Sequence, residues 1–437
     1  MSILLQNAIL SNVFATPASV AAQITAAAFT SAQIMTKEGE QLIASLQVTR
    51  PANVGTAYFA TSRAISATFT VKTSTGYARL INSDGSLGSQ AGTGAAGSNI
   101  TLTIPASGLH RALGVLSVVN AGSTQSGSIT SITISNHQLT TFSGTGLSSL
   151  TSLGLSNNRL TTFSATGLSS LTSLDLNNNQ LTTFSGTGLS SLTNLTLSFN
   201  QLTTFSATGL SSLTSLILGN NQLTTFSGTG LSSLGTLGLN NNQLTTFSGT
   251  GLSSLTFFDI SYNQLTTFSG TGLSSLGTLG LNNNQLTTFS ATGLSSLTSL
   301  GLGNNQLTTF SGTGLSSLTS LTLSNNQLTT FSATGLSSLS SLYLDYNQLT
   351  TFSGTGLSSL ISLTINNNQL VTIDCTALTL NYISSFSFNN LSAIALNDFF
   401  TSLGSVLYGY FSVASNPGSA TCNPAIATAK GYTVSIV

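Results

Sequence analysis

A single pattern repeats through more than half of this 437-residue chain. A phenylalanine returns every 21 residues, and an isoleucine takes the last place of the series. The positions are Phe142, Phe163, Phe184, Phe205, Phe226, Phe247, Phe268, Phe289, Phe310, Phe331, Phe352 and Ile373. A fixed period of this length predicts a solenoid of stacked coils, because no single unit of this size can bury its own apolar face.

The apolar positions of the unit predict where each wall of a coil lies. Leu153, Gly154 and Leu155 alternate as a strand does, so that both leucines point inward and residue 154 points outward. Neighbouring coils should join these strands into a parallel sheet, with strands ~4.8 Å apart. Phe163 and its equivalents are expected to fill the core from another wall, stacked from coil to coil. Gly167 then allows a tight bend at positive φ.

The unit L-x-x-L-x-L-x-x-N-x-L resembles the leucine-rich repeat family, in a short 21-residue bacterial or phage type, over residues 129–380. The resemblance implies a β-rich solenoid of twelve repeats with a parallel sheet on its concave face. It also implies that the asparagine, Asn158 in one repeat, lies inside a bend and bonds the backbone of adjacent coils. Such partners are needed because an unpaired buried amide costs ~1–3 kcal/mol. The convex segment is too short for an α-helix, so loops or 3₁₀ turns are predicted there.

The residues outside the repeats predict three further parts. Residues 1–35 are uncharged and rich in Ala, Thr and Ser, and are interpreted either as an arm that docks on another subunit or as a loosely ordered terminus. Residues 36–128 carry short β-prone runs between turn signals, which predicts a small all-β, sandwich-like module that caps the open end of the solenoid. Residues 381–437 mix helical and strand spacing and predict an α/β C-terminal cap.

Charge is nearly absent, since 4% of the residues are charged and the formal net charge is zero. Between residues 129 and 370 the only basic residue is Arg159, so a nucleic-acid partner is excluded for the repeats. No apolar run is long enough to span a membrane, and the first basic residue is Lys37, which does not suit a signal peptide. Neither membrane insertion nor export by a leader is therefore predicted.

Chemistry-bearing residues are sparse and scattered. His110 and His137 stand alone, and no metal-ligand spacing, cofactor motif or Ser/His/Asp set is present. Asp175, Asp259 and Asp345 are spaced four coils apart, roughly 19 Å, which is too far for two carboxylates to act on one bond. The chain is therefore predicted to be no enzyme and to need no metal and no cofactor.

The two cysteines leave two interpretations open. Cys375 and Cys422 could form a disulfide if the C-terminal cap brings their Cα atoms within ~7 Å. Otherwise they are two buried thiols.

Variation between nearly identical repeats points to candidate binding residues on the predicted concave face. Two coils combine aromatic rings with an acid, and a third coil carries an isolated ring. The residues are Phe257, Asp259 and Tyr262, then Tyr343, Asp345 and Tyr346, and finally Phe199. A ring that meets C–H groups, beside a carboxylate that accepts hydroxyls, suits a sugar. Neutral drift among duplicated repeats is the alternative explanation.

A Ser/Thr/Asn/Gly surface without an export signal predicts a bacteriophage virion component, such as a tail or head fibre, a decoration protein or a receptor-binding protein. It would be assembled in the host cytoplasm as a homo-oligomer and exposed outside the particle. Residues 1–128 would contact other virion or fibre subunits, and the repeats would contact a host cell-surface protein or glycan. The alternatives are a bacterial extracellular adhesin and a self-assembling fibre or spacer subunit.

An ice-binding solenoid is the alternative ranked last. The paired threonines Thr161 and Thr162 recur in the coils and suggest a hydroxyl array. Adjacent residues of a strand-like backbone point to opposite sides, however, and this is the reason for the low rank.

Overall fold

The computed structural model describes residues 129–135, 139–144, 147–376, 378–382 and 384–437, and before them the backbone of the short strands between residues 34 and 117. The chain divides into two compact units, Met1–Leu192 and Thr193–Val437, here called the N-terminal unit and the C-terminal unit. His110 and His137 lie outside the described residues, as does most of the predicted arm.

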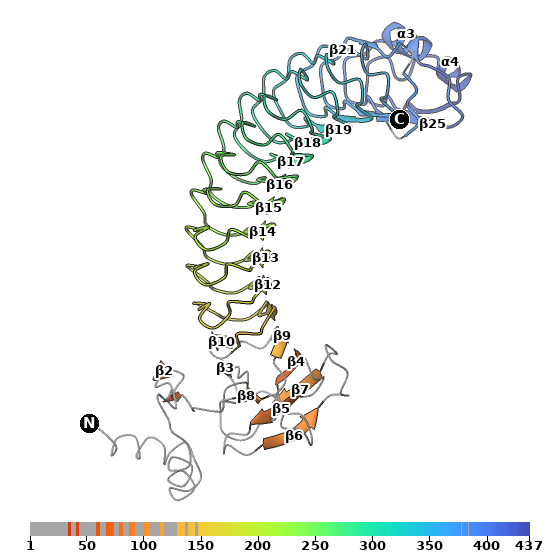
Figure 1. The fold of residues 1–437 in the computed structure, drawn as a ribbon. Coiled ribbons are helices and arrows are strands. Elements are labelled where there is room, and N and C mark those ends of the chain that lie inside the picture. Colours follow the sequence, from red (N-terminus) through yellow and green to blue (C-terminus); the bar gives the residue numbers. More distant parts are fainter. Residues whose placement is uncertain are drawn as a thin grey trace, which may run out of the picture. The chain divides into compact units, whose positions relative to one another are not determined.

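The N-terminal unit contains short antiparallel strands followed by the first repeats (Figure 1). Its strands are β1 (Ile34–Met35), β2 (Gln41–Leu42), β3 (Tyr58–Thr61), β4 (Ala67–Thr73), β5 (Ala78–Ile81), β6 (Leu87–Ala91), β7 (Ile100–Ile104), β8 (Gly114–Ser117), β9 (Ile129–Thr133), β10 (Leu139–Ser143), β11 (Ser152–Gly154) and β12 (Ser173–Asp175). One sheet has the order β10-β3-β8-β5-β6. The β-prone runs lie at residues 56–60, 67–72, 77–81, 100–104 and 113–119, and they predicted β3, β4, β5, β7 and β8; strands β1, β2 and β6 were not predicted. A sandwich-like arrangement of these strands stays a prediction.

The first repeat strand, β9, joins the two kinds of sheet. It pairs in parallel with β11, with Ile132 opposite Leu153. On its other edge it pairs antiparallel with β4, where Val71 lies opposite Ile132. Strand β4 therefore occupies an edge of the parallel sheet that would otherwise present unpaired backbone groups.

The C-terminal unit continues the repeats and ends in larger coils. Its strands are β13 (Asn194–Thr196), β14 (Ser215–Ile217), β15 (Thr236–Gly238), β16 (Phe257–Asp259), β17 (Thr278–Gly280), β18 (Ser299–Gly301), β19 (Ser320–Thr322), β20 (Ser341–Tyr343), β21 (Thr351–Ser353), β22 (Ser362–Thr364), β23 (Thr372–Asp374), β24 (Ser384–Ser385), β25 (Gly409–Ser412) and β26 (Tyr432–Ser435). Its helices are α3 (Ala393–Ser402) and α4 (Ala425–Thr428). Most of the strands form one parallel sheet in constant register, with Leu216 opposite Leu237 and Leu237 opposite Phe258.

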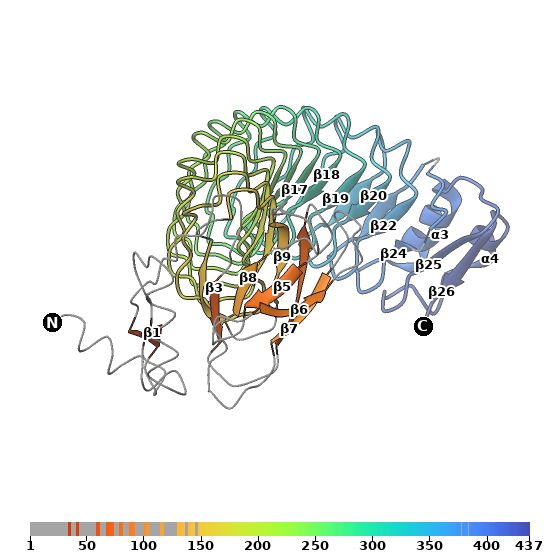
Figure 2. The same ribbon diagram turned by 60° about the horizontal axis from the view of Figure 1, so that its bottom comes forward.

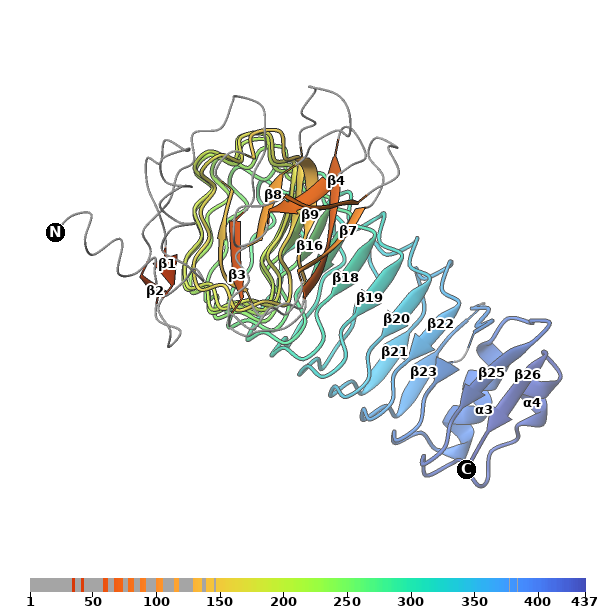
Figure 3. The same cartoon turned by 90° about the horizontal axis from the view of Figure 1, so that it is seen from below.

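The walls of each coil differ in structure. In Figure 2 the loops of the C-terminal unit form arches away from the strands β17–β22. Figure 3 shows β18, β19, β20 and β22 as a row of neighbouring strands. The arches are bends and turns without helix, as predicted, and Gly230 adopts the expected positive φ of 89°. A second small sheet, not predicted, pairs β21 with β23 in parallel.

Leucine columns make the innermost core, and the rings of the phenylalanine column are buried in some coils and partly buried in others. Leu237, Leu239 and Leu244 are fully buried, whereas Phe247 and Phe289 are only partly buried. The predicted stacking is present, since the rings of Phe289 and Phe310 are 6.2 Å apart with planes 12° apart. The expectation that the rings fill the core is confirmed for Phe268, Phe310 and Phe352, which are 4–8% exposed, and is wrong in part for the coils whose rings are only partly buried.

The core asparagines bond the backbone of adjacent coils, as the resemblance implied. Asn242, 8% exposed, accepts a hydrogen bond at Oδ1 from the backbone N–H of Leu223 at 3.0 Å. Its Nδ2 donates to the backbone carbonyls of Leu218, Leu239 and Asn240 at 3.1, 3.0 and 3.3 Å. One side chain thus satisfies polar groups from the preceding coil and from its own bend.

The C-terminal coils contain the predicted helices. Ser392 caps α3 by accepting a hydrogen bond from the backbone N–H of Ala395 at 3.2 Å. Lys430 donates to the carbonyls of Thr401 and Leu403 at 2.5 and 2.6 Å, so a cation satisfies acceptors at the C-terminal end of α3. The core of this part is aromatic and includes fully buried Phe411.

Both cysteines are free thiols, so the disulfide interpretation is wrong. Cys375 is buried, and burial raises the pKa of its thiol far above the usual range, with a further contribution from the neighbouring Asp374 carboxylate. Burial also raises the pKa of the Tyr432 hydroxyl. Cys422 is only partly buried, which corrects the alternative of two buried thiols for this residue.

We expect the free energy of unfolding to fall as the pH rises above about 9, the ordinary pKa of a thiol. A raised pKa in the folded state means that the unfolded chain releases the proton first, so stability is complete below this pH and is lost above it. Each such group contributes a slope of about 1.4 kcal/mol per pH unit. Urea melts of the wild type and Cys375→Ala between pH 7 and pH 10 measure the slope. The variant should lose less stability over this range, and equal slopes would contradict the assignment.

Candidate functional site

One position of the repeat is held in the left-handed region of backbone space. The residue before each core asparagine has a φ between 53° and 58° in the coils described. In the C-terminal unit these residues form what we call the left-handed column: Phe199, Asn220, Asn241, Tyr262, Asn283, Asn304, Asn325, Tyr346, Asn367 and Phe388. Asparagine tolerates this conformation better than other residues with a side chain, which explains its frequency there.

The four aromatic residues of the left-handed column are unusual. Phe199, Tyr262, Tyr346 and Phe388 are 58%, 55%, 57% and 57% exposed. Each adopts a conformation that costs an aromatic residue about 1 kcal/mol or more. Because the rings are exposed, burial in the core does not offset this cost. Drift has no physical reason to direct rings to the column where they are most strained, so their placement favours a binding role.

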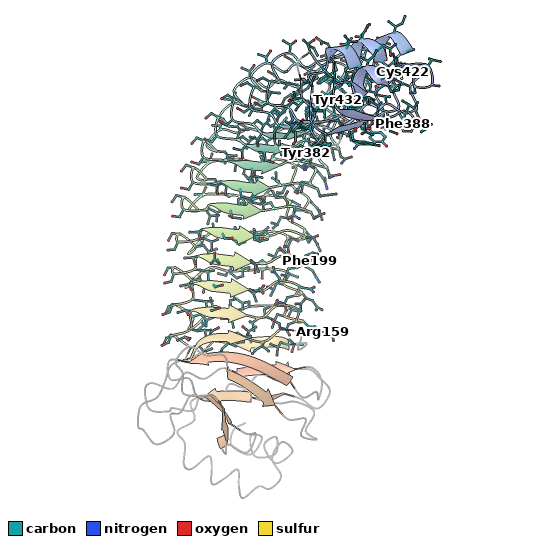
Figure 4. All side chains as sticks on the ribbon, turned by 90° about the vertical axis from the view of Figure 1, so that its right-hand side faces the viewer. Arg159, Phe199, Tyr382, Phe388, Cys422 and Tyr432 are labelled. Atoms are coloured by element: carbon teal, nitrogen blue, oxygen red, sulfur yellow. The ribbon has the colours of Figure 1, made fainter. Side chains whose placement is uncertain are left out.

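The last coils form an open hollow of about 480 Å³ beside this column. It is lined by Ser324, Asn325, Asp345, Tyr346, Asn366, Asn367, Ser385, Ser387 and Phe388. The structure thus brings together Asp345 and Tyr346, two of the residues singled out from the sequence. It adds Phe388, which sequence reasoning missed. Figure 4 shows Phe388 on the same side of the coils of the C-terminal unit as Phe199.

Asp345 is the hub of a hydrogen-bond network under the hollow. Its Oδ1 accepts from the backbone N–H and the Nδ2 of Asn366 at 2.8 and 2.7 Å. Its Oδ2 accepts from Thr364 Oγ1 at 2.5 Å and, more weakly, from Ser324 Oγ at 3.5 Å. A carboxylate offers about four acceptor positions, and all are taken by the protein itself. Asp345 therefore positions Asn366 and is poorly placed to accept ligand hydroxyls.

The network extends into the following coils. The Oδ1 of Asn366 accepts from the backbone N–H of Ser387 at 2.9 Å and from Ser385 Oγ. The hydroxyls of Ser387 and Ser412 lie 2.8 Å apart. The floor of the hollow is thus a chain of satisfied polar groups, which holds it rigid.

The other residues predicted from the sequence do not line this hollow. Asp259 Oδ1 accepts from the backbone N–H and hydroxyl of Ser261 at 3.0 and 2.6 Å. Phe257, in the same strand β16, is 42% exposed. Tyr343 ends strand β20 and is 36% exposed. The two predicted clusters are therefore not equivalent, because Asp259 belongs to a strand whereas Asp345 lies in the bend after one.

The threonine pairs of most coils lie outside strands, which corrects the argument against an ice-binding face. Thr245 and Thr246 are both exposed, as are the equivalent pairs of the coils before and after. They do not point to opposite sides of a strand, since this segment of the coil is no strand. The regular array of exposed threonine pairs therefore gives the ice-binding alternative more support than its low rank in the sequence analysis implied.

The described part of the chain contains neither a cluster of metal-binding side chains nor a membrane-spanning helix. No group of three or more His, Cys, Asp or Glu residues lies close enough there to hold a metal ion. Within the same residues, no helix has the length and apolarity to cross a membrane.

Comparison with known proteins agrees with this fold. The family profile described as Leucine Rich repeats (2 copies) matches residues 148–191, and the one described as Leucine rich repeat matches residues 307–349. No curated protein matches the chain significantly. Among solved structures, it is similar to a leucine-rich repeat protein of Leptospira interrogans, with 28% identity and a TM-score of 0.53 over 62% of this chain and 74% of that one.

Two structures of YopM are also similar. For YopM of Yersinia enterocolitica the identity is 25% and the TM-score 0.54, over 65% of this chain and 60% of that one. For YopM of Yersinia pestis, a leucine-rich effector protein, the identity is 23% and the TM-score 0.53, over 70% of this chain and 88% of that one. The 21-residue period, the parallel strands and the bonded asparagine columns, together with the profile matches, show that the repeats of this chain are leucine-rich repeats.

Proposed function

We propose that this protein is a non-enzymatic binding protein that presents the left-handed column and the adjoining strand face of its repeats to a host-surface protein or glycan. The observation that carries the proposal is the set of four exposed rings at strained positions, Phe199, Tyr262, Tyr346 and Phe388. Rings that are exposed and rigidly held are suited to contact another molecule. The similarity to YopM, an effector protein, supports a binding role for such a solenoid.

We further propose a virion component of a bacteriophage, such as a fibre, decoration or receptor-binding protein, with residues 1–128 contacting other subunits in a homo-oligomer. The nearly uncharged polar surface supports this proposal. Immunogold electron microscopy of particles from the source culture, with antibody to the repeats, should label the particle exterior. Detection of the chain only in secretions of uninfected cells would favour the bacterial adhesin instead.

The binding role is tested by replacing the four rings together with asparagine, the usual residue of the column. Because asparagine tolerates the left-handed conformation, the variant should fold at least as well as the wild type. We expect adsorption of the full chain to host cells to fall at least about tenfold, a loss of ~1.4 kcal/mol shared among four rings.

Salt provides an independent check on the same adsorption. The contacts proposed are rings and amides, so raising the ionic strength from about 0.1 M to about 0.5 M should change adsorption little. Gln243→Ala, an exposed substitution outside the column, is the control. Unchanged adsorption of the four-ring variant would favour a spacer or fibre subunit without a ligand.

A further inference from the structure

We infer that the hollow between Tyr346 and Phe388 binds a neutral oligosaccharide; this inference rests on the proposed binding function and specifies its ligand. Consecutive coils place Asn325, Tyr346, Asn367 and Phe388 in the left-handed column, and all four line the hollow. Amide and ring therefore alternate at this end of the column. Rings can meet the C–H faces of sugars, and amides can both donate to and accept from hydroxyls.

No other described stretch of the column in the C-terminal unit has two rings separated by one amide. The ring of Tyr262 stands between Asn241 and Asn283, with no second ring in the coils next to these amides. Only Asn367, among the described coils of this unit, has an aromatic residue on both sides in the column. The two flanking residues are two coils apart, about 10 Å at ~4.8 Å per coil, a spacing that suits the length of an extended glycan rather than one sugar.

The two amides of the hollow differ from the asparagine pair at this position in the N-terminal unit, where Asn178 Nδ2 donates to Asn157 Oδ1 at 2.7 Å. The side chains of Asn325 and Asn367 have no hydrogen bond to any described residue. Two amides thus remain available for hydroxyls beside two exposed rings.

The electrostatics of the hollow favour a ligand without charge. Asp345 carries the only carboxylate among its lining residues, none of which is a lysine, arginine or histidine, and this carboxylate is occupied by Thr364, Asn366 and Ser324. An anionic ligand would meet this negative charge without any cation to offset it. A cationic ligand would have to break hydrogen bonds that the protein already makes. Neutral sugars avoid both costs.

The test measures binding of the full chain to immobilised neutral oligosaccharides of glucose, galactose, mannose and N-acetylglucosamine, with sialylated and sulfated chains as charged comparators. We expect binding to at least one neutral chain of three or more sugars. We do not expect a protein that binds the charged comparators but no neutral chain. Tyr346→Asn and Phe388→Asn should each weaken it about tenfold or more. Their thermal midpoints should equal or exceed that of the wild type, because each change relieves strain.

Tyr382→Asn is the control, since Tyr382 is an exposed aromatic residue outside both the hollow and the left-handed column. It should leave oligosaccharide binding unchanged. Equal weakening by all three variants, or binding of charged chains only, would overturn the inference. Host-cell adsorption that depends on the four rings, without binding to any neutral chain, would overturn the sugar assignment and leave the proposed binding function standing. Loss of both would overturn both.

Discussion

Phe258→Ala is expected to destabilise the C-terminal unit by about 3–5 kcal/mol, whereas Phe257→Ala should cost less than ~1 kcal/mol. The two residues are adjacent in strand β16 and identical in type, but Phe258 is fully buried and Phe257 is 42% exposed. Phe258 takes the place of a core leucine, and its ring lies 4.5 Å from that of Phe247. Its removal would leave a cavity that the rigid neighbouring coils fill poorly.

Phe258→Leu supplies a graded control, because it restores the residue that stands opposite in the sheet, Leu237 on one side and Leu279 on the other. It should cost less than ~1.5 kcal/mol. Guanidinium melts followed by circular dichroism measure all three variants. Since coils contact only their neighbours, the alanine variant should also show unfolding in two steps, one for each side of the defect. Similar shifts for Phe257→Ala and Phe258→Ala would contradict the burial described here.

Asn242→Ala is expected to cost about 2–5 kcal/mol, although it removes only one amide. The backbone N–H of Leu223 would lose its acceptor, and the carbonyls of Leu218 and Leu239 would lose a donor. Each buried polar group left unpaired costs about 1–3 kcal/mol. Water cannot easily replace the amide, because the position is 8% exposed.

The next residue provides the control for this change. Gln243 is exposed, and its backbone N–H bonds to the carbonyl of Leu223 at 2.9 Å whatever its side chain. Gln243→Ala should change stability by less than ~0.5 kcal/mol. Equal effects of the two substitutions in a denaturant melt would mean that the asparagine column contributes little to the solenoid.

The repeat pattern of the sequence predicts part of the candidate site. Phe388 precedes Asn389 as Tyr346 precedes Asn347, so the same column could have been followed into the last coils, where the pattern of the repeats loosens. The sequence did place Asp345 beside Tyr346. It did not reveal that the Asp345 carboxylate is occupied, because its partners, Thr364 and Asn366, come from the following coil.

The sequence by itself determined the solenoid, its parallel sheet and the glycine bends, because a strict period fixes the residues that share a column and therefore face the same environment. The resemblance to leucine-rich repeats, which the sequence also carries, implied the bonded asparagines. Only the tertiary structure decided that some of the Phe rings are only partly buried and that both threonines of pairs such as Thr245 and Thr246 are exposed. It also decided that four rings sit at left-handed positions beside the strand face. Those outcomes depend on how the backbone bends between columns and on which coil supplies each hydrogen-bond partner, and a period in the sequence specifies neither.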